Sequence, residues 1–207
     1  MDYSKIIQFI KKTLEDTDAI VDRRHNLFFR NRFEHSVRVF KWVKRLSVDF
    51  DDFDYDVALT AALFHDVGYA NGQKDHPIES DRIFKEYAKE NNFSQDLIDK
   101  VSYIILNHSD KGLLKTSKNK EMILVLEADL LDEEGSMGIV WDLLAAGSRN
   151  ANSYLNAIDS IKSHSGHILS QDYMVTPLAI KIWDEKKNLV KDFIKQLYED
   201  LFVEEEI

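Results

Sequence analysis

Residues that form turns are scarce along this chain. Only 7 glycines and 2 prolines occur among 207 residues, which leaves few positions for the tight turns of a many-stranded sheet. Apolar residues instead recur every three or four positions through most of the sequence, which is the spacing of one face of an α-helix. We therefore expect an all-α fold, built as a single-domain helical bundle.

The expected helices follow from this periodicity and from residues that favour helix starts. Asp54 or Asp56 and Ser94 are suitable N-caps, and Pro77 and Pro177 suit the first turn of a helix. A loop of turn formers is expected after the third helix. The expected ranges are 2–16, 32–47, 56–65, 77–90, 94–108, 119–132 and 177–202 for helices, 68–72 for the loop, and 136–164 for a helical region that breaks near Gly147.

The composition excludes several classes of protein. The chain has no cysteine, so disulfides, thiolate ligands and a thiol nucleophile are excluded, as suits a reducing cytosol. No run of about 18 apolar residues occurs, so no membrane span is expected. The N-terminus lacks the order of a signal peptide, and we expect a cytoplasmic protein; an oligomer is left open. The formal charge of −10 argues against broad nucleic-acid binding but not against a small anionic substrate, because bound cations reverse the local field.

The pair His65 and Asp66 lies where an apolar helical run, residues 57–64, comes to an end. An imidazole and a carboxylate side by side can hold one divalent cation from one short segment. The negative end of the helix dipole disfavours Asp66 there unless a cation or a donor compensates. The alternative is an ordinary solvated aspartate, but we favour a metal ligand.

Two further side chains complete a four-part set in the order His, His-Asp, Asp. His35 lies beside the apolar stripe of its helix, where its alternative is a core histidine bonded to a backbone carbonyl. Asp129 lies in an otherwise apolar helical stretch, where a buried carboxylate is costly unless it binds a cation or several donors. Glu127 is its rival, but the two lie about 160° apart around the helix, so we expect only one of them to face the core.

Two more histidines allow a second ion. His76 and His108 both lie at expected helix ends, where a side chain easily reaches a cleft; the alternative is an exposed terminal histidine. Two ions about 3.5–4 Å apart suit in-line attack on phosphorus, with Asp66 as the bridging carboxylate. Ligands without sulfur suit Mn²⁺, Fe, Zn²⁺, Ni²⁺, Co²⁺ or Mg²⁺, and the choice among them, and between one ion and two, stays open.

Other residues are candidates for catalysis and substrate binding. Asp66 would hold the metal and orient a water molecule that the cation activates, while Glu34 or Asp132 would act behind the ligands. Lys74, Arg38 and Arg149 are candidate phosphate contacts. The alternatives are an exposed loop lysine for Lys74 and a surface salt bridge for Arg38.

A second pair of histidines, His164 and His167, lies among serines and a glycine. The pair is similar to a short metal-binding tract. The surrounding residues favour a solvated turn instead.

The four-part set resembles the HD-domain phosphohydrolase superfamily. The matching residues are His35, the pair His65 and Asp66 followed by Gly68, and Asp129. The resemblance implies an all-helical metal enzyme that cleaves phosphoesters or phosphoanhydrides, often in nucleotides. Residues 1–207 would form one HD-type domain, with a metal-site core at about 30–135 and a C-terminal helical extension over 136–207.

A narrower resemblance concerns residues 128–139 and 176–194, which look like a bacterial HD subgroup of Mn²⁺-dependent nucleoside triphosphate pyrophosphohydrolases. That subgroup has a His-Asp pair around its first histidine, where this chain has Glu34 and His35. The segments around His76 and His108 are closer to two-metal HD proteins that cleave diadenosine tetraphosphate. We therefore expect a phosphohydrolase acting on a small phosphorylated substrate, with a nucleotide-sensing domain without catalysis, di-iron oxygenase chemistry and a structural bundle with incidental histidines as alternatives.

Overall fold

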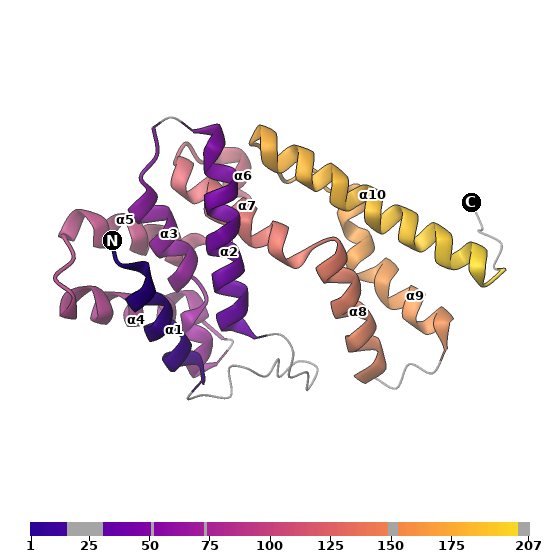
Figure 1. Ribbon diagram of the computed structural model, residues 1–207, viewed down its shortest axis with the longest axis horizontal. Coiled ribbons are helices and arrows are strands. Elements are labelled where there is room, and N and C mark those ends of the chain that lie inside the picture. The colour runs from indigo at the N-terminus through magenta and orange to yellow at the C-terminus, as the bar shows by residue number, and fades with distance from the viewer. Residues whose placement is uncertain (16–30, 51, 73, 149–152, 203–207) are drawn as a thin grey trace. The chain divides into compact units, whose positions relative to one another are not determined.

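The computed structural model describes residues 1–15, 31–50, 52–72, 74–148 and 153–202. Within these ranges every regular element is a helix, so the all-α prediction is confirmed (Figure 1). No helix of these ranges is long and apolar enough to cross a membrane. With η marking 3-10 helices, the elements are α1 (Tyr3–Glu15), α2 (Arg32–Leu46), η2 (Ser47–Asp49), α3 (Tyr55–Phe64), η3 (Val67–Asn71), α4 (His76–Glu90), α5 (Gln95–Asn107), α6 (Leu113–Thr116), α7 (Lys120–Glu133), α8 (Ser136–Ser148), α9 (Tyr154–Ser163), η4 (Ser165–Ser170) and α10 (Pro177–Asp200).

The helices form two compact units that divide after Asp132. The N-terminal unit holds α1 to α7, and the C-terminal unit holds α8 to α10. The division falls close to the expected boundary between the core at 30–135 and the extension at 136–207. The assignment of one HD-type domain to the whole chain stays a prediction.

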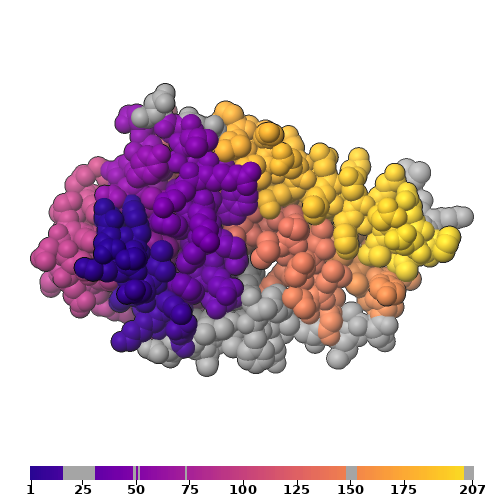
Figure 2. Space-filling view, in the orientation of Figure 1, coloured from indigo at the N-terminus to yellow at the C-terminus, as the bar shows by residue number. Residues whose placement is uncertain are grey.

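Helix α3 is the centre of the N-terminal unit. Every residue from Val57 to Phe64 is buried, because α2 and α5 both pack against this helix. Asp54 caps its start by accepting a hydrogen bond from the backbone N–H of Val57 at 3.2 Å, as expected for a short acidic side chain at an N-cap. Helices α1 and α2 cover one face of this unit (Figure 2). A helix enclosed in this way holds its C-terminal end, and the residues just beyond it, inside the unit.

Three other expected helix starts are confirmed, and one expectation is wrong. The hydroxyl of Ser94 accepts from the backbone N–H of Leu97, and Pro77 and Pro177 lie in the first turns of α4 and α10. The expected loop over 68–72 is instead mostly the 3-10 helix η3. Short 3-10 turns commonly continue from the end of an α-helix, and here the turn packs against α4.

The C-terminal unit forms its own core. Helix α8 packs against α9 and α10, and η4 packs against all three of these helices. The side chain of Asp142 is buried in α8 and accepts hydrogen bonds from the backbone N–H and the hydroxyl of Ser165, at 2.8 and 2.6 Å. The helical region expected over 136–164 is thus α8 and α9, with α8 ending at Ser148, one residue after Gly147.

Gly68 is required where η3 meets α4. A Cβ atom at this position would lie 2.2 Å from the backbone oxygen of His76 and 2.5 Å from the backbone nitrogen of Ser80. The N–H of Gly68 also donates to the Ser80 hydroxyl at 2.8 Å. We expect Gly68→Ala to lower the free energy of unfolding by about 1–3 kcal/mol or more, because backbone atoms must move apart. Thermal and urea unfolding would measure the change.

Gly147→Ala is the matched control for this substitution. Gly147 is exposed in α8, and a Cβ atom there would meet nothing within 4 Å. We expect Gly147→Ala to raise the free energy of unfolding by about 0.5–1 kcal/mol, since alanine restricts the unfolded chain and favours a helix. Equal effects of the two substitutions would show that the close approach at Gly68 does not constrain the fold.

Candidate metal centre

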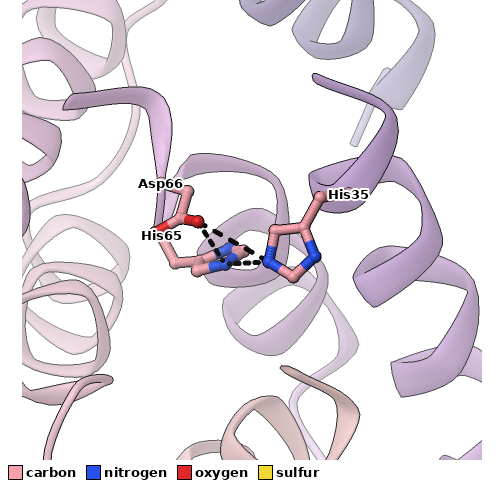
Figure 3. Close-up of side chains that lie close together, drawn as sticks. All are labelled: His35, His65 and Asp66. Atoms are coloured by element: carbon pink, nitrogen blue, oxygen red, sulfur yellow. Dashed lines mark hydrogen bonds and ion pairs between the residues drawn. The ribbon is translucent and has the colours of Figure 1, made fainter. Parts of the chain in front are cut away.

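Three side chains from two helices meet inside the N-terminal unit. His35 lies on α2, while His65 and Asp66 follow the last turn of α3, and all three are buried. The Nε2 atoms of the two histidines are 3.2 Å apart, and Asp66 Oδ2 lies 3.6 Å from that of His35 and 3.5 Å from that of His65 (Figure 3). The carboxylate oxygen and both ring nitrogens therefore point at one common point.

Asp129 joins this cluster from α7. Its Oδ1 atom lies 3.1 Å from His35 Nε2 and 3.7 Å from His65 Nε2. The four-part set read from the sequence is thus brought together in space. We call the point that these four side chains surround the first ion position.

His76 and His108 form a second cluster around the other oxygen of Asp66. Their Nε2 atoms are 3.1 Å apart, and they lie 3.3 and 3.4 Å from Asp66 Oδ1. His76 begins α4 and His108 directly follows α5. We call this point the second ion position; Asp66 offers one oxygen to each position, as expected for a bridging carboxylate.

Most of these histidines are oriented by a hydrogen bond at Nδ1. His65 donates to the carbonyl oxygen of Ala62 at 2.8 Å, and His108 donates to that of Ile105 at 2.7 Å. His35 Nδ1 lies 2.8 Å from Asp132 Oδ2. A proton on Nδ1 leaves the lone pair on Nε2, and an acceptor behind the ring raises the basicity of that nitrogen. These three rings are therefore prepared to be ligands through Nε2.

Each carboxylate at the cluster also contacts a side-chain cation. Arg32 Nη1 lies 2.7 Å from Asp66 Oδ2, and Lys111 Nζ lies 2.5 Å from Asp129 Oδ2. Burial alone would raise the pKa of Asp66, but the neighbouring ring of His65 and the guanidinium of Arg32 hold it well below its usual range. Burial opposes ionisation of Asp129 in the same way, and Lys111 and His35 lower its pKa well below normal. Both carboxylates are thus kept charged inside the protein.

The pKa values of the two histidines of the first ion position shift in opposite directions. Burial lowers the pKa of His65 to about 4, against the attraction of Asp66 and Asp129. Burial also disfavours protonation of His35, but hydrogen bonds with Asp129 and Asp132 outweigh it and raise the pKa of His35. His65 is therefore neutral near pH 7, as a ligand must be.

These donors fit a divalent cation. Asp66 belongs to two groups of three residues whose potential ligand atoms all lie within 4.8 Å of one another. One group contains His35 and His65, and the other contains His76 and His108. Imidazole nitrogens that face each other at hydrogen-bond distance need a proton or a cation between them, because two lone pairs repel. Imidazole and carboxylate ligands without sulfur suit Mn²⁺, Fe, Zn²⁺, Ni²⁺ or Co²⁺. These clusters are thus able to hold a metal, and the identity of that metal stays open.

The other predicted site residues lie in different surroundings. Asp132 contacts both His35 and Arg38, and Arg38 holds it with two bonds of 2.8 and 2.9 Å. The side chains of Glu34 and Lys74 are exposed. Arg149 lies outside the described residues. Of the two candidates for a role behind the ligands, Asp132 is the one in contact with a ligand.

The expectation that only one of Glu127 and Asp129 faces the core is wrong. Their side chains are both buried, with 0% and 9% of the residue surface exposed. The expectation assumed that α7 has one buried face, but the whole run from Leu124 to Asp129 is buried. A helix enclosed on all sides buries carboxylates that point in nearly opposite directions.

His164 and His167 belong to the C-terminal unit and are exposed. His164 Nδ1 donates to the Ser160 carbonyl oxygen at 2.9 Å, and His167 Nε2 lies 3.5 Å from Glu134 Oε1. Among the residues that the structure describes, neither histidine belongs to a group of three metal-competent side chains. Their local contacts are those of a polar turn.

Two cations at the centre, Arg32 and Lys111, were missed in the sequence. Each lies three residues from a histidine of the site: Arg32 precedes His35, and Lys111 follows His108. On a helix that spacing places side chains on one face, which is a usable signal for Arg32. Lys111 lies in a turn beyond α5, where the helical rule does not apply.

Residues 32–134 match the model of the HD domain family, and this range contains all six candidate ligands. This segment therefore belongs to the HD-domain family. No curated protein sequence matches the chain significantly.

Solved structures support the same fold. An HD-superfamily hydrolase from Bacillus thuringiensis is 20% identical with a TM-score of 0.73, and 97% of each chain is covered. The Lin1889 protein from Listeria innocua is 23% identical with a TM-score of 0.66, over 99% of this chain and 100% of that one. YpgQ from Bacillus subtilis, solved in complex with ADP, is 19% identical with a TM-score of 0.65, over 95% and 96%. At these sequence identities, the similarity shows that this chain shares the fold of the three proteins.

Asp132 gives a test of how the first ion position is organised. In Asp132→Asn the partner of His35 Nδ1 loses its charge, and Arg38 loses its ion pair. We expect the affinity for Mn²⁺ or Zn²⁺ to fall about 10–100-fold, the usual effect of losing an acceptor behind a ligating histidine. Titration with Mn²⁺ or Zn²⁺, followed by calorimetry, would measure this affinity. Asp96→Asn, which changes an exposed carboxylate of α5, is the control, and an equal loss in both variants would contradict the role of Asp132.

Proposed function

We propose that this protein is a metal-dependent phosphohydrolase whose substrate is a small phosphorylated molecule. One observation carries the proposal: Asp66 presents its two oxygens to two separate pairs of histidine nitrogens. A carboxylate that bridges two divalent cations suits the in-line displacement of a leaving group from phosphorus. Membership of the HD-domain family supports the same reaction class.

The proposed roles follow from the contacts. His35, His65, Asp66 and Asp129 would hold one ion, and Asp66 with His76 and His108 a second. Bound divalent cations would acidify a water molecule and neutralise phosphate oxygens. Asp66 would also help to orient the attacking water, because both of its oxygens lie at the centre of the site.

Other side chains would act around these ligands. Arg32 keeps Asp66 ionised, and Asp132 fixes the ring of His35. Arg38, Lys74 and Arg149 stay proposed as phosphate contacts, and Glu34 as an auxiliary catalytic residue.

We further propose that the substrate is a nucleotide. YpgQ, which shares the fold over 95% of this chain, was solved in complex with ADP. The segments 128–139 and 176–194 also resemble nucleoside triphosphate pyrophosphohydrolases. A diphosphate or triphosphate chain carries several negative charges and suits a site with two divalent cations.

The first test is turnover of a nucleotide panel with Mn²⁺, with products identified by mass spectrometry. The panel comprises nucleoside mono-, di- and triphosphates and diadenosine tetraphosphate. Pyrophosphate with a nucleoside monophosphate would identify a pyrophosphohydrolase, and orthophosphate a phosphatase. Two nucleotides from diadenosine tetraphosphate would identify a dinucleotide hydrolase.

Asp66→Ala is the variant for this assay, because it removes a ligand from both ion positions. We expect turnover to fall to background. Saturating Mn²⁺ should no longer raise the Tm, whereas a metal at about 100 times its dissociation constant adds about 2.7 kcal/mol to the wild type. Full activity in the variant would refute the proposal. If the wild type is stabilised by metal and binds nucleotides but turns none over, the result would point to a sensing domain. If the iron-loaded protein oxidises a substrate, the result would point to oxygenase chemistry.

The second ion position has its own test in His108→Gln. Glutamine retains much of the volume of the side chain but is a poor ligand, so we expect the bound Mn²⁺ to fall from two ions to one per chain. The first position should keep its ion, because His108 faces Asp66 Oδ1 at 3.4 Å. The histidines of the first position face the other oxygen, Oδ2. Elemental analysis after dialysis would measure the ratio. One ion per chain in both proteins would show that only one position binds.

A further inference from the structure

Within the described part of the chain, three side-chain cations contact the carboxylates of the metal centre, and they differ in how firmly they are held. Arg32 has a side chain only 9% exposed, and its guanidinium lies 4.1 Å from the centre of the Tyr69 ring. Arg38 donates two hydrogen bonds to Asp132, one to each carboxylate oxygen. A guanidinium fixed by stacking or by two parallel bonds is a structural partner of the carboxylate that it holds.

Lys111 is held differently. Its ammonium bonds one oxygen of Asp129 at 2.5 Å and the backbone oxygen of His108 at 3.0 Å. The side chain is 26% exposed and comes from a turn between α5 and α6. An ammonium on four methylene groups is a compact charge that changes partner without moving the backbone. Lys111 is therefore the most easily redirected of the three cations.

The two contacts of Lys111 place it beside both ion positions. Asp129 turns its Oδ1 atom to His35 of the first position and its Oδ2 atom to Lys111. His108, whose carbonyl oxygen accepts the other bond, lines the second position through its ring. An anion bound across both positions would therefore lie within the reach of this side chain.

We infer that Lys111 is a phosphate-binding residue that exchanges its ion pair with Asp129 for the phosphate of the substrate. The inference rests on the proposed function and deepens it. Once Asp129 holds a divalent cation, Lys111 loses much of the attraction that keeps it there and also meets a like charge. A phosphate oxygen then offers the ammonium a better partner.

This exchange predicts opposite effects on metal and on phosphate. As long as Lys111 pairs with Asp129, it competes with the cation for that carboxylate. Lys111→Gln should therefore bind Mn²⁺ as tightly as the wild type or more tightly. The same variant should bind inorganic phosphate about tenfold or more weakly when loaded with Mn²⁺, the size of one charge-assisted hydrogen bond.

The experiment is calorimetric titration of the full chain, first with Mn²⁺ alone and then with inorganic phosphate at saturating Mn²⁺. Lys115→Gln, which changes an exposed lysine of α6, is the matched control and should change neither affinity. Lys111→Arg keeps the charge and should retain most of the phosphate affinity. If Lys111→Gln fails to fold, as seen by circular dichroism, Lys111→Arg and Lys111→Met replace it in the same two titrations.

Two results would overturn the inference. A loss of Mn²⁺ affinity in Lys111→Gln would mean that the lysine only orients Asp129. An unchanged phosphate affinity would mean that it does not touch the anion. Both titrations are independent of turnover, so weaker phosphate binding in the variant would support Lys111 even if no nucleotide were cleaved. Where a substrate is turned over, KM should rise in the variant more than kcat falls.

Discussion

The buried carboxylate of Asp66 is the constraint on which the N-terminal unit depends. A carboxylate without partners inside a protein is costly by several kcal/mol, and this one also follows the C-terminal end of α3, where the helix dipole repels it. Arg32 on α2 forms an ion pair with it, and the Nε2 atoms of His76 and His108 lie 3.3 and 3.4 Å from its other oxygen. These partners come from α2, α4 and the end of α5, so the carboxylate ties three helices to the end of the central one.

The ends of the helices supply the geometry of the ligands. His65 and His108 each donate Nδ1–H to the carbonyl oxygen three residues earlier, in the last turn of the helix that they follow. Those carbonyls have no partner within the helix, so the same bond satisfies the backbone and fixes the ring. A histidine at a helix end is thus oriented by local structure alone, without help from distant residues. His35, in the first turns of α2, needs the long-range partner Asp132 instead.

This difference explains how far the sequence predicts the site. The helix ends at His65, His76 and His108 follow from local signals, and so does the all-α fold. The spacing of Arg32 from His35 places both on one face of a helix, but the pairing of Arg32 with Asp66 depends on how the helices pack. The pairing of Lys111 with Asp129 likewise depends on packing, which no spacing along the chain encodes. The burial of both Glu127 and Asp129 also depends on packing, because the sequence pattern describes one buried face while α7 is enclosed on all sides. Local chemistry is therefore predictable here, but long-range compensation of charge is not.

The balance of charge at the centre explains how an acidic chain can accept an anion. Asp66, Asp129 and Asp132 each pair with a side-chain cation, so the charges of these three carboxylates and three cations cancel. Any divalent cation then makes the centre positive, although the whole chain carries −10. Screening limits the repulsion by distant surface carboxylates to about 8–10 Å at physiological salt, while buried charges are screened less. An anionic substrate would therefore be attracted by the centre only at short range, and only after the metal has bound.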